Sequence, residues 1–369
     1  MYINKKIFKE MDYSILFSMI AICILGIISI GSATNAFVEG GNPKTFIMQI
    51  LWFIFSCIIG FVVLLIDYNT IGDYYKVIYI FTNILLVLVL VAGSERNGAK
   101  SWLGIGTFGI QPSEFAKVSL IIGLAKILEG MDNINTWKNM LKILIYVGIP
   151  MFLIKLEPDT GTNIIFLVII AGMLFVAGLN AKIIWGVIGT GLLGFFGAYK
   201  FGKLQEHQMH RISVFLHPEM DRLGNGYNAY LAKIAIGSGM FFGRGINNSD
   251  LTRGEFIPYC HTDFIFSTFA EAFGFLGCII LLGFYFNLIY KSIKIANESK
   301  DKFGKYMVIG IVTMLTYQIL QNIGMDIGIV PITGIPLPFM SYGGSSLLTN
   351  VIAIALVLNV GMRKKKINF

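Results

Sequence analysis

Long apolar runs recur from one end of the chain to the other, and they constrain its fold more than any other feature. Runs of about 17 to 25 residues are long enough to cross the ~30 Å hydrocarbon layer of a bilayer as helices. About ten such runs can be placed, separated by polar segments. They fall at about 13–33, 46–66, 74–92, 113–129, 141–156, 163–179, 183–200, 264–290, 306–326 and 343–362. The sequence therefore predicts an all-α, polytopic integral membrane protein.

The composition agrees with this prediction. Hydrophobic residues make up 55% of the 369-residue chain and charged residues only 14%, and the mean hydropathy is +0.72. This is far more apolar than a soluble core of that size requires, so we expect one transmembrane domain over residues 1–369, with the lipid bilayer as its solvent. The first run starts near Tyr13 without an evident small-residue cleavage site, which indicates a retained span rather than a cleaved signal peptide.

The basic residues predict the topology. The net charge is +8, but Lys and Arg lie in short loops and at the C-terminal tail, a pattern that argues against a nucleic-acid partner. With a cytoplasmic N-terminus, the positive-inside rule is met at nearly every loop, and an even number of spans leaves both termini cytoplasmic. The outer segments would then be 34–45, 93–112, 157–162, 201–263 and 327–342.

The largest outer segment, about 201–263 between the predicted spans seven and eight, is too long for a simple connection. Its aromatic and glycine content argues against disorder, so we expect short helices that lie in the membrane interface or re-enter the membrane edge. Its cations would suit an anionic lipid headgroup, because guanidinium and ammonium groups pair well with phosphate oxygens. These cations are Arg211, Arg222, Lys233, Arg244 and Arg253.

The loop ends at His261-Thr262-Asp263-Phe264, where the chain re-enters lipid. Desolvation there would raise the pKa of Asp263 toward the range of a general base, whereas nearby cations would lower it. The alternative is that Thr262 or Asp263 caps the following helix, and the two roles are compatible. His261 alone is weak evidence for a metal site, because no second ligand stands at helical spacing from it.

Polar residues also gather around the start of the fourth span. Glu114 and Lys117 share one helical face and would form an ion pair inside the bundle, either for function or only for packing. Ser113 follows a proline and is predicted to be the N-cap of that helix. Lys100 and Trp102 would serve there as part of a site or as interfacial anchors.

Two further outer segments are polar or broken. In Glu157-Pro158-Asp159-Thr160, we expect Asp159-Thr160 to cap the sixth span. Between 327 and 346, three prolines and a Gly-Gly pair at membrane depth indicate broken backbone, which is tolerated only where protein or a water-filled cavity satisfies it. Something is expected to be bound or shaped there, with Ser341 and Ser345 as candidate substrate contacts, although a purely architectural role stays open.

Taken together, these strings resemble the SEDS family (shape, elongation, division and sporulation), the bacterial RodA and FtsW proteins. The matching strings are GAKSWL, QPSEFAK, EPDTGT, GNGYN with IAIGSG, HTDFIF and PITGIPLPFMSYGGSS, in that order. The QNIGM string and the short basic C-terminus look more like RodA than FtsW. The chain departs from the family pattern at Glu157, Leu231, Tyr259 and Ala272, which bears on details of the acceptor site and of partner contact.

The resemblance implies a peptidoglycan glycosyltransferase that polymerises lipid II outside the bacterial cytoplasmic membrane during elongation. It implies a class B penicillin-binding protein and other membrane proteins of the elongation complex as partners. The family's essential aspartate falls on Asp263. Candidate substrate-binding residues are then Lys100, Trp102, Glu114, Lys117, Arg211, Lys233, His261, Ser341 and Ser345.

The expected reaction is a single inverting displacement in which Asp263 deprotonates the acceptor 4-hydroxyl. That oxygen attacks the anomeric carbon of the donor and expels its lipid pyrophosphate, with Lys100, Lys117 and Arg211 as stabilising cations. A divalent cation, Mg²⁺ or Mn²⁺, bound to the pyrophosphate would do the same, although the sequence shows no dedicated ligand cluster. The alternatives are a lipid II flippase or transporter, which no inverted repeat supports, and a scaffold of the elongation complex.

Overall fold

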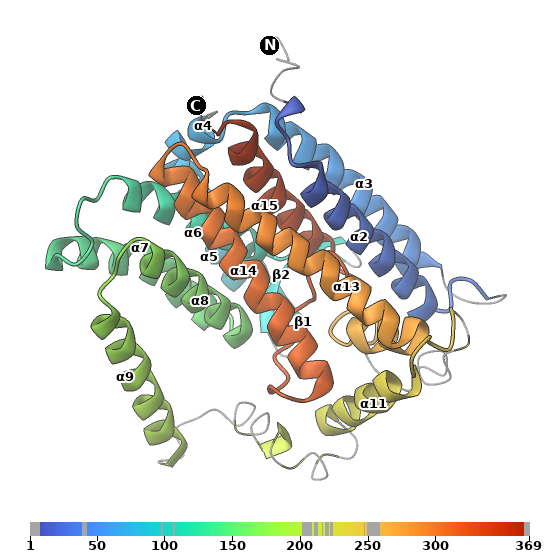
Figure 1. The fold of residues 1–369 in the computed structure, drawn as a ribbon. Helices are drawn as coiled ribbons and strands as arrows, with labels where there is room; N and C mark the ends of the chain where they lie inside the picture. Colours follow the sequence, from blue (N-terminus) through green and yellow to red (C-terminus); the bar gives the residue numbers. More distant parts are fainter. Residues whose placement is uncertain are drawn as a thin grey trace.

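A computed structural model shows the chain as a bundle of helices (Figure 1). It describes residues 8–38, 43–96, 99–105, 108–200, 209, 213–215, 217, 221, 224–246, 248 and 259–364. Each predicted span corresponds to one helix. These helices are α2 (Tyr13–Ala33), α3 (Lys44–Leu65), α5 (Tyr75–Ala92), α6 (Pro112–Glu129), α7 (Trp137–Leu156), α8 (Thr160–Val176), α9 (Ala181–Lys200), α13 (Ile265–Asn297), α14 (Lys302–Ile327) and α15 (Gly344–Met362).

Most of these helices have the length and composition of membrane spans. Among the described residues, seven are long and apolar enough to cross a bilayer, and α8 is a shorter apolar helix. The prediction of an all-helical, multi-pass membrane protein is therefore confirmed. A short helix, α4 (Tyr68–Asp73), joins α3 to α5.

The centre of the bundle is formed by α6, α14 and α15. α14 packs against α6, α8 and α13, whereas α15 packs mainly against α3, and α13 lies along α2. In the most apolar 18-residue stretch of α15, 89% of the residues are buried, compared with only 17% in the corresponding stretch of α5. The peripheral helices expose apolar side chains because lipid, not water, is their solvent.

A small antiparallel sheet between α5 and α6 was not predicted. Its strands are β1 (Ser94–Arg96), β2 (Ala99–Ile105) and β3 (Phe108–Ile110), in the order β1-β2-β3. Trp102 lies opposite Ser94, and Gly104 lies opposite Gly109. The strands are short, and glycine interrupts β2 and β3, so they carry little of the polar-apolar alternation that signals a strand. Together with the segment 328–343, this sheet marks what we call the sheet end of the bundle.

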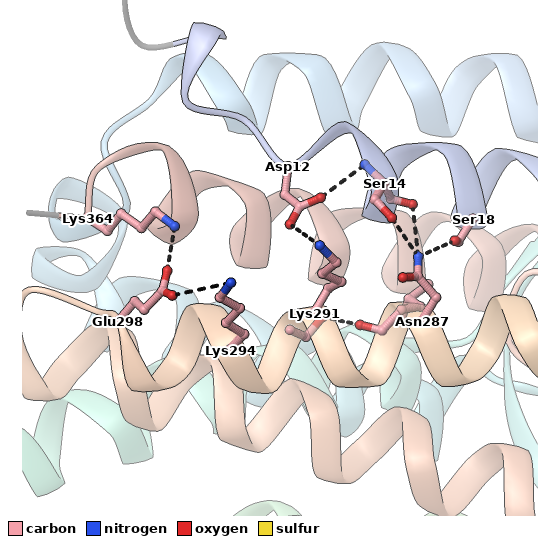
Figure 2. A network of polar contacts seen from close by, with 10 residues as sticks. Asp12, Ser14, Ser18, Asn287, Lys291, Lys294, Glu298 and Lys364 are labelled. Carbon is pink, nitrogen blue, oxygen red and sulfur yellow. Dashed lines mark hydrogen bonds and ion pairs between the residues drawn. The ribbon is translucent and has the colours of Figure 1, made fainter. Parts of the chain in front are cut away.

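A polar network ties α2 to α13 at the opposite end (Figure 2). The Asn287 amide donates to Ser14 Oγ and Ser18 Oγ, at 2.8 Å each. Lys291 Nζ lies 3.8 Å from Asp12 Oδ2, and Asp12 also caps α2 by accepting from Ser14 N–H. The start of α2 and the end of α15 both lie at this end of the bundle (Figure 1).

The same network reaches the end of α15 through Glu298. Lys364 donates to this carboxylate, and Lys294 Nζ lies 3.9 Å from it (Figure 2). The hydrogen bond from Lys364 lowers the pKa of Glu298 below its ordinary value. The opposite end therefore carries charged pairs, which lower the cost of charges close to the hydrocarbon.

α13 is not one continuous helix, because its backbone breaks at Gly274, where φ is 66° and ψ is −167°. The break removes helical partners from backbone groups on both sides of it. The segment 239–245, which follows α11 (Asn225–Ser238), supplies replacements. The four bonds run from Arg244 N to Glu271 O (2.9 Å), from Gly245 N to Ala272 O (3.0 Å), from Phe275 N to Met240 O (2.9 Å) and from Leu276 N to Phe241 O (3.1 Å).

The close approach of the segment 239–245 to the break in α13 requires glycine in both segments. A Cβ on Gly243 would lie 2.2 Å from Ala272 O, and one on Gly274 would lie 2.2 Å from Gly243 N. The eighth span is thus two helical pieces, and the shorter piece, 265–273, follows directly after Asp263. α11 also confirms the expectation of a short helix within the loop 201–263.

Candidate functional site

Asp263 lies at the sheet end, in a turn that leads into α13. The residue at the cap position of this helix is Phe264, whose side chain makes no capping bond. The carboxylate that binds the N–H of the first turn belongs to Asp326 of α14, whose Oδ2 accepts from Ser267 N at 2.9 Å. The prediction placed Thr262 or Asp263 at the cap; the structure places Phe264 at the cap position, and Asp326 of α14 binds Ser267 N–H.

Two elements surround the half-buried Asp263. The Asn322 amide of α14 donates to Asp263 O at 2.8 Å and to Ile335 O at 2.9 Å. Gly334 faces the Asp263 carboxylate, since a Cβ at that glycine would lie 3.6 Å from Oδ2. The candidate base therefore lies between the end of α14 and the segment 328–343.

The segment 328–343 has the broken backbone that its prolines predicted, and polar side chains of the helices satisfy it. Gln321 Nε2 donates to Pro331 O at 3.1 Å. On the other side, Gln49 of α3 donates to Ser341 O and accepts from Gly343 N–H, at 3.2 and 3.3 Å. The expectation that protein groups satisfy this backbone is confirmed for these atoms.

Ser341 and Ser345 use their hydroxyl groups to join segments. Ser341 Oγ donates to Thr262 O at 2.7 Å and accepts from Leu337 N–H at 2.8 Å. Ser345 Oγ accepts from Gln111 N–H at 3.1 Å, just before α6. Both serines are buried. Their hydroxyls therefore fix the loops of the site, and contact with substrate stays a prediction for them.

His261 lies next to the contact between Thr262 and Ser341. Its ring packs edge-on against Tyr342 with 5.8 Å between ring centroids, and its carbonyl accepts from Tyr342 N–H at 2.9 Å. Burial lowers the pKa of the imidazole, which favours the neutral ring at neutral pH. Within the described ranges, no three His, Cys, Asp or Glu side chains gather closely enough to hold a metal ion.

The acidic turn at 157–160 lies against the same loop. Asp159 caps α8 by accepting from Thr162 N–H at 2.9 Å, which confirms the predicted cap. A Cβ on Gly161 would lie 3.2 Å from Thr333 O, so this turn packs on the residues next to Gly334. Gln111 Nε2 also donates to Asp159, at 3.4 Å.

Glu157 is wholly buried in that turn. Among the described residues, neither of its carboxylate oxygens has a hydrogen-bond partner. Burial, and secondarily the charge of Asp159, raises the pKa of Glu157 to about 8. A carboxyl group in this state carries its proton at neutral pH.

The predicted ion pair of α6 is confirmed. Lys117 Nζ lies 2.7 Å from Glu114 Oε1, and the two side chains are 0% and 5% exposed. In the described part of the chain, Glu114 Oε2 and Ser113 Oγ have no hydrogen-bond partner. The prediction that Ser113 is the N-cap was wrong, because Gln111 occupies that position and Pro112 begins the helix. Proline suits the first helical position, where its missing N–H costs nothing.

The remaining candidates lie on the sheet and on the loop. The backbone of Lys100 lies opposite that of Glu95 in the register of β1 and β2, and Trp102, also on β2, is half-buried. Lys233 is exposed on α11, and a Cβ on Gly328 would lie 2.3 Å from its Nζ. The ammonium group thus lies over the carboxyl end of α14, where a cation is favourable. Arg211 lies outside the described residues.

Asn322 and Asp326 are two residues of the site for which the sequence predicted no role. Both are fully buried and contact the segment that carries Asp263. Their spacing of four residues, which places them on one helical face, was the available signal. It was not sufficient, because the sequence does not show which segment that face meets.

Comparisons with known proteins agree with this architecture. Residues 11–366 match the FtsW/RodA/SpoVE family, described as cell cycle proteins. The chain is 34% identical over 361 residues to the stage V sporulation protein E of Bacillus subtilis (strain 168), with 95% of this chain and 98% of that protein covered. It is 31% identical over 428 residues to the peptidoglycan glycosyltransferase RodA of Treponema pallidum (strain Nichols), with 96% and 98% covered.

A solved structure of a peptidoglycan synthase complex, concerned with the coordination of polymerization and crosslinking, is also similar. The TM-score is 0.82 at 29% identity, over 95% of this chain and 97% of that chain. The protein therefore belongs to the FtsW/RodA/SpoVE family, the SEDS family that its motifs indicated. Relatives named SpoVE, RodA and FtsW all match over most of the chain, so the particular similarity to RodA stays a prediction.

Proposed function

We propose that this protein is a peptidoglycan glycosyltransferase that polymerises lipid II at the outer face of the bacterial cytoplasmic membrane. The observation that carries the proposal is the position of Asp263, a half-buried carboxylate held between α14 and the segment 328–343. Family membership and the activity of relatives such as RodA of Treponema pallidum support it. In this proposal the sheet end faces outward and both termini are cytoplasmic.

Asp263 acts as the general base. It accepts the proton of the acceptor 4-hydroxyl while that oxygen forms a bond to the anomeric carbon of the donor. The bond from this carbon to the lipid pyrophosphate breaks with inversion, and the pyrophosphate leaves with the bonding electron pair. A base held by the protein at the reacting oxygen contributes about 10²–10⁴-fold in rate.

The cations of the site have different roles in this mechanism. The Lys117 ammonium forms an ion pair with Glu114 at 2.7 Å, so the pair contributes little net charge. Its role in this mechanism is to present fixed polar groups to the substrate. Stabilisation of the leaving pyrophosphate therefore falls to the remaining candidates, Lys100, Arg211 and the exposed Lys233. A divalent cation that arrives with the pyrophosphate would supply the same stabilisation.

The proposed setting is cell elongation, with a class B penicillin-binding protein as the partner that crosslinks the new glycan. The QNIGM string favours elongation. The similar structure of a peptidoglycan synthase complex supports a crosslinking partner. Bacterial cells depleted of the protein should lose rod shape before they fail to divide.

A polymerisation assay tests the activity. Purified protein with its partner is given lipid II, and the glycan chains are separated on a gel. We expect polymer from the wild type and almost none from Asp263→Asn, which keeps the size of the side chain but removes the base. Asp12→Asn is the matched control, because Asp12 is an aspartate cap at the opposite end of the bundle.

Wild-type polymer yield from a folded Asp263→Asn protein would refute the role of Asp263. Absence of polymer from the wild type, even with its partner, would favour the flippase or the scaffold. A flippase would move labelled lipid II across the bilayer of proteoliposomes, whereas a scaffold would not.

A further inference from the structure

Asn322 and Asp326 contact opposite ends of the segment that begins with Asp263. The Asn322 amide donates to Asp263 O at 2.8 Å, and Asp326 Oδ2 accepts from Ser267 N–H at 2.9 Å. Both side chains are completely buried. Because they lie one turn apart on α14, a single rigid helix holds the segment 263–267 at two points.

The break in α13 makes these contacts important. The segment 265–273 is separated from the rest of α13 by the non-helical backbone at Gly274. The long part of α13 therefore does not fix the direction of the short part by helical continuity. Its orientation depends on lateral contacts, which include those from α14 and those from 239–245.

Asn322 also positions the segment 333–335, which lies on the other side of Asp263. Its second amide contact is to Ile335 O at 2.9 Å, next to Gly334, which faces the Asp263 carboxylate. One side chain thus joins Asp263 to the segment 333–335. Within the helix, Ser267 Oγ donates to Phe264 O at 2.6 Å and stiffens the same turn.

A carboxyl side chain suits the position of Asp326. It lies at the amino end of a helical segment, where a side-chain oxygen can accept from an otherwise unpaired backbone N–H group. Its Oδ2 accepts from Ser267 N–H, four residues after Asp263. Asp326 is therefore placed to influence the direction of the segment that begins with Asp263.

We propose that Asn322 and Asp326 are positioning residues. They hold Asp263 at a fixed position relative to the segment 333–335, as proton transfer requires. The proposal rests on the proposed glycosyltransferase function. It predicts that the two residues affect the chemical step rather than the binding of lipid II. Displacement of a reacting group by about 1 Å can cost on the order of 10²-fold in rate.

The kinetic test uses the full-length protein with its partner and three variants, Asp326→Ala, Asp326→Asn and Asn322→Ala. We expect kcat to fall about tenfold to a hundredfold for both alanine variants, with KM for lipid II nearly unchanged. Asp326→Asn should recover part of kcat, because its amide oxygen can still accept from Ser267 N–H. Wild-type kcat in folded Asp326→Ala protein would overturn the proposal.

The matched control is Asp301→Ala. Asp301 caps the other end of α14 by accepting from Gly304 N–H at 2.7 Å, about 40 Å away at a rise of 1.5 Å per residue. This variant should lower the melting temperature without lowering kcat. An equal loss of kcat in Asp301→Ala would show a general effect on folding and would overturn the positioning role.

Hydrogen exchange provides a measurement that does not depend on activity. The amides of residues 264–268 should exchange faster in Asp326→Ala and Asn322→Ala than in the wild type or in Asp301→Ala. Unchanged exchange would overturn the proposal. If the wild type made no polymer, the proposed function would fail, and exchange would still decide whether the two residues hold this segment.

Discussion

Lys117 and Glu114 form an ion pair of 2.7 Å that is shielded from solvent on the first turns of α6. Removing one partner leaves a buried charge without compensation, which costs about 3–5 kcal/mol. We therefore expect Lys117→Met to lower the free energy of unfolding by that amount. Thermal melting of the purified protein in detergent would measure the loss.

A double variant, Glu114→Gln with Lys117→Met, separates packing from function. It removes both charges, so its stability should return to near that of the wild type. We expect polymerisation to remain impaired, because the pair lies among the candidate substrate-binding residues. A stable double variant with wild-type polymer yield would show that the pair serves packing alone.

Gly274 should tolerate no side chain. Its φ of 66° and ψ of −167° lie in a region that is essentially restricted to glycine, and strain of this kind costs about 1–3 kcal/mol. A Cβ would also overlap Gly243 N at 2.2 Å. Gly274→Ala should therefore destabilise the protein by more than the strain alone, as measured by its melting temperature.

Gly283 provides the comparison for that variant within the same helix. A Cβ there meets nothing within 4 Å, and alanine is favoured over glycine in a helix by about 1 kcal/mol. Gly283→Ala should be neutral or stabilising. Equal melting temperatures for the two variants would contradict the importance of the crossing at Gly274.

Glu157 should make stability depend on pH. The folded protein keeps the proton of this carboxyl up to about pH 8, whereas the unfolded chain releases it near pH 4.5. Between these values the folded state binds more protons, so the free energy of unfolding falls as the pH rises. The slope is at most about 1.4 kcal/mol per pH unit, and it ends above pH 8.

Melting temperatures from pH 5 to pH 9 would test this dependence. Glu157→Gln cannot titrate, so it should melt higher than the wild type at pH 8 and show a flatter profile. Glu298→Gln is the control, because the pKa of that carboxyl is lowered and its titration lies below this range. A wild-type profile in Glu157→Gln would rule out a protonated Glu157.

Asn359 should be needed for stability but not for catalysis. Its amide donates to Val63 O and Ile66 O, at 2.7 and 2.6 Å, and its oxygen accepts from Tyr68 N–H at 3.1 Å. Asn359→Leu leaves these buried backbone groups unsatisfied, at a cost of about 1–3 kcal/mol for each group. The melting temperature should fall, while kcat of the folded protein should not change.

A leucine at the exposed Asn297 serves as the control for Asn359→Leu, because little contact is lost there. A fall in kcat for Asn359→Leu without a change in melting temperature would contradict the structural role. The position of Asn359 also explains why no motif marked it. Besides Arg363, its partners lie on residues 63–68, far away along the chain.

The sequence alone determined the spans and much of the site. Each apolar run predicted a helix, because a helix satisfies its own backbone hydrogen bonds and needs only enough apolar length to cross lipid. The ion pair of Glu114 and Lys117 was predictable for a similar reason, since residues three apart on a helix are neighbours. Local periodicity was sufficient for both predictions.

The tertiary structure decided how Asp263 is held. Asp326 accepts a hydrogen bond from Ser267 N–H, and Asn322 donates one to the Asp263 carbonyl. Each bond joins residues that are 59 positions apart in the chain. The break at Gly274 likewise depends on a segment 30 or so residues earlier that supplies the missing hydrogen bonds. Contacts of this kind arise from the packing of whole helices, and no local spacing encodes which faces meet.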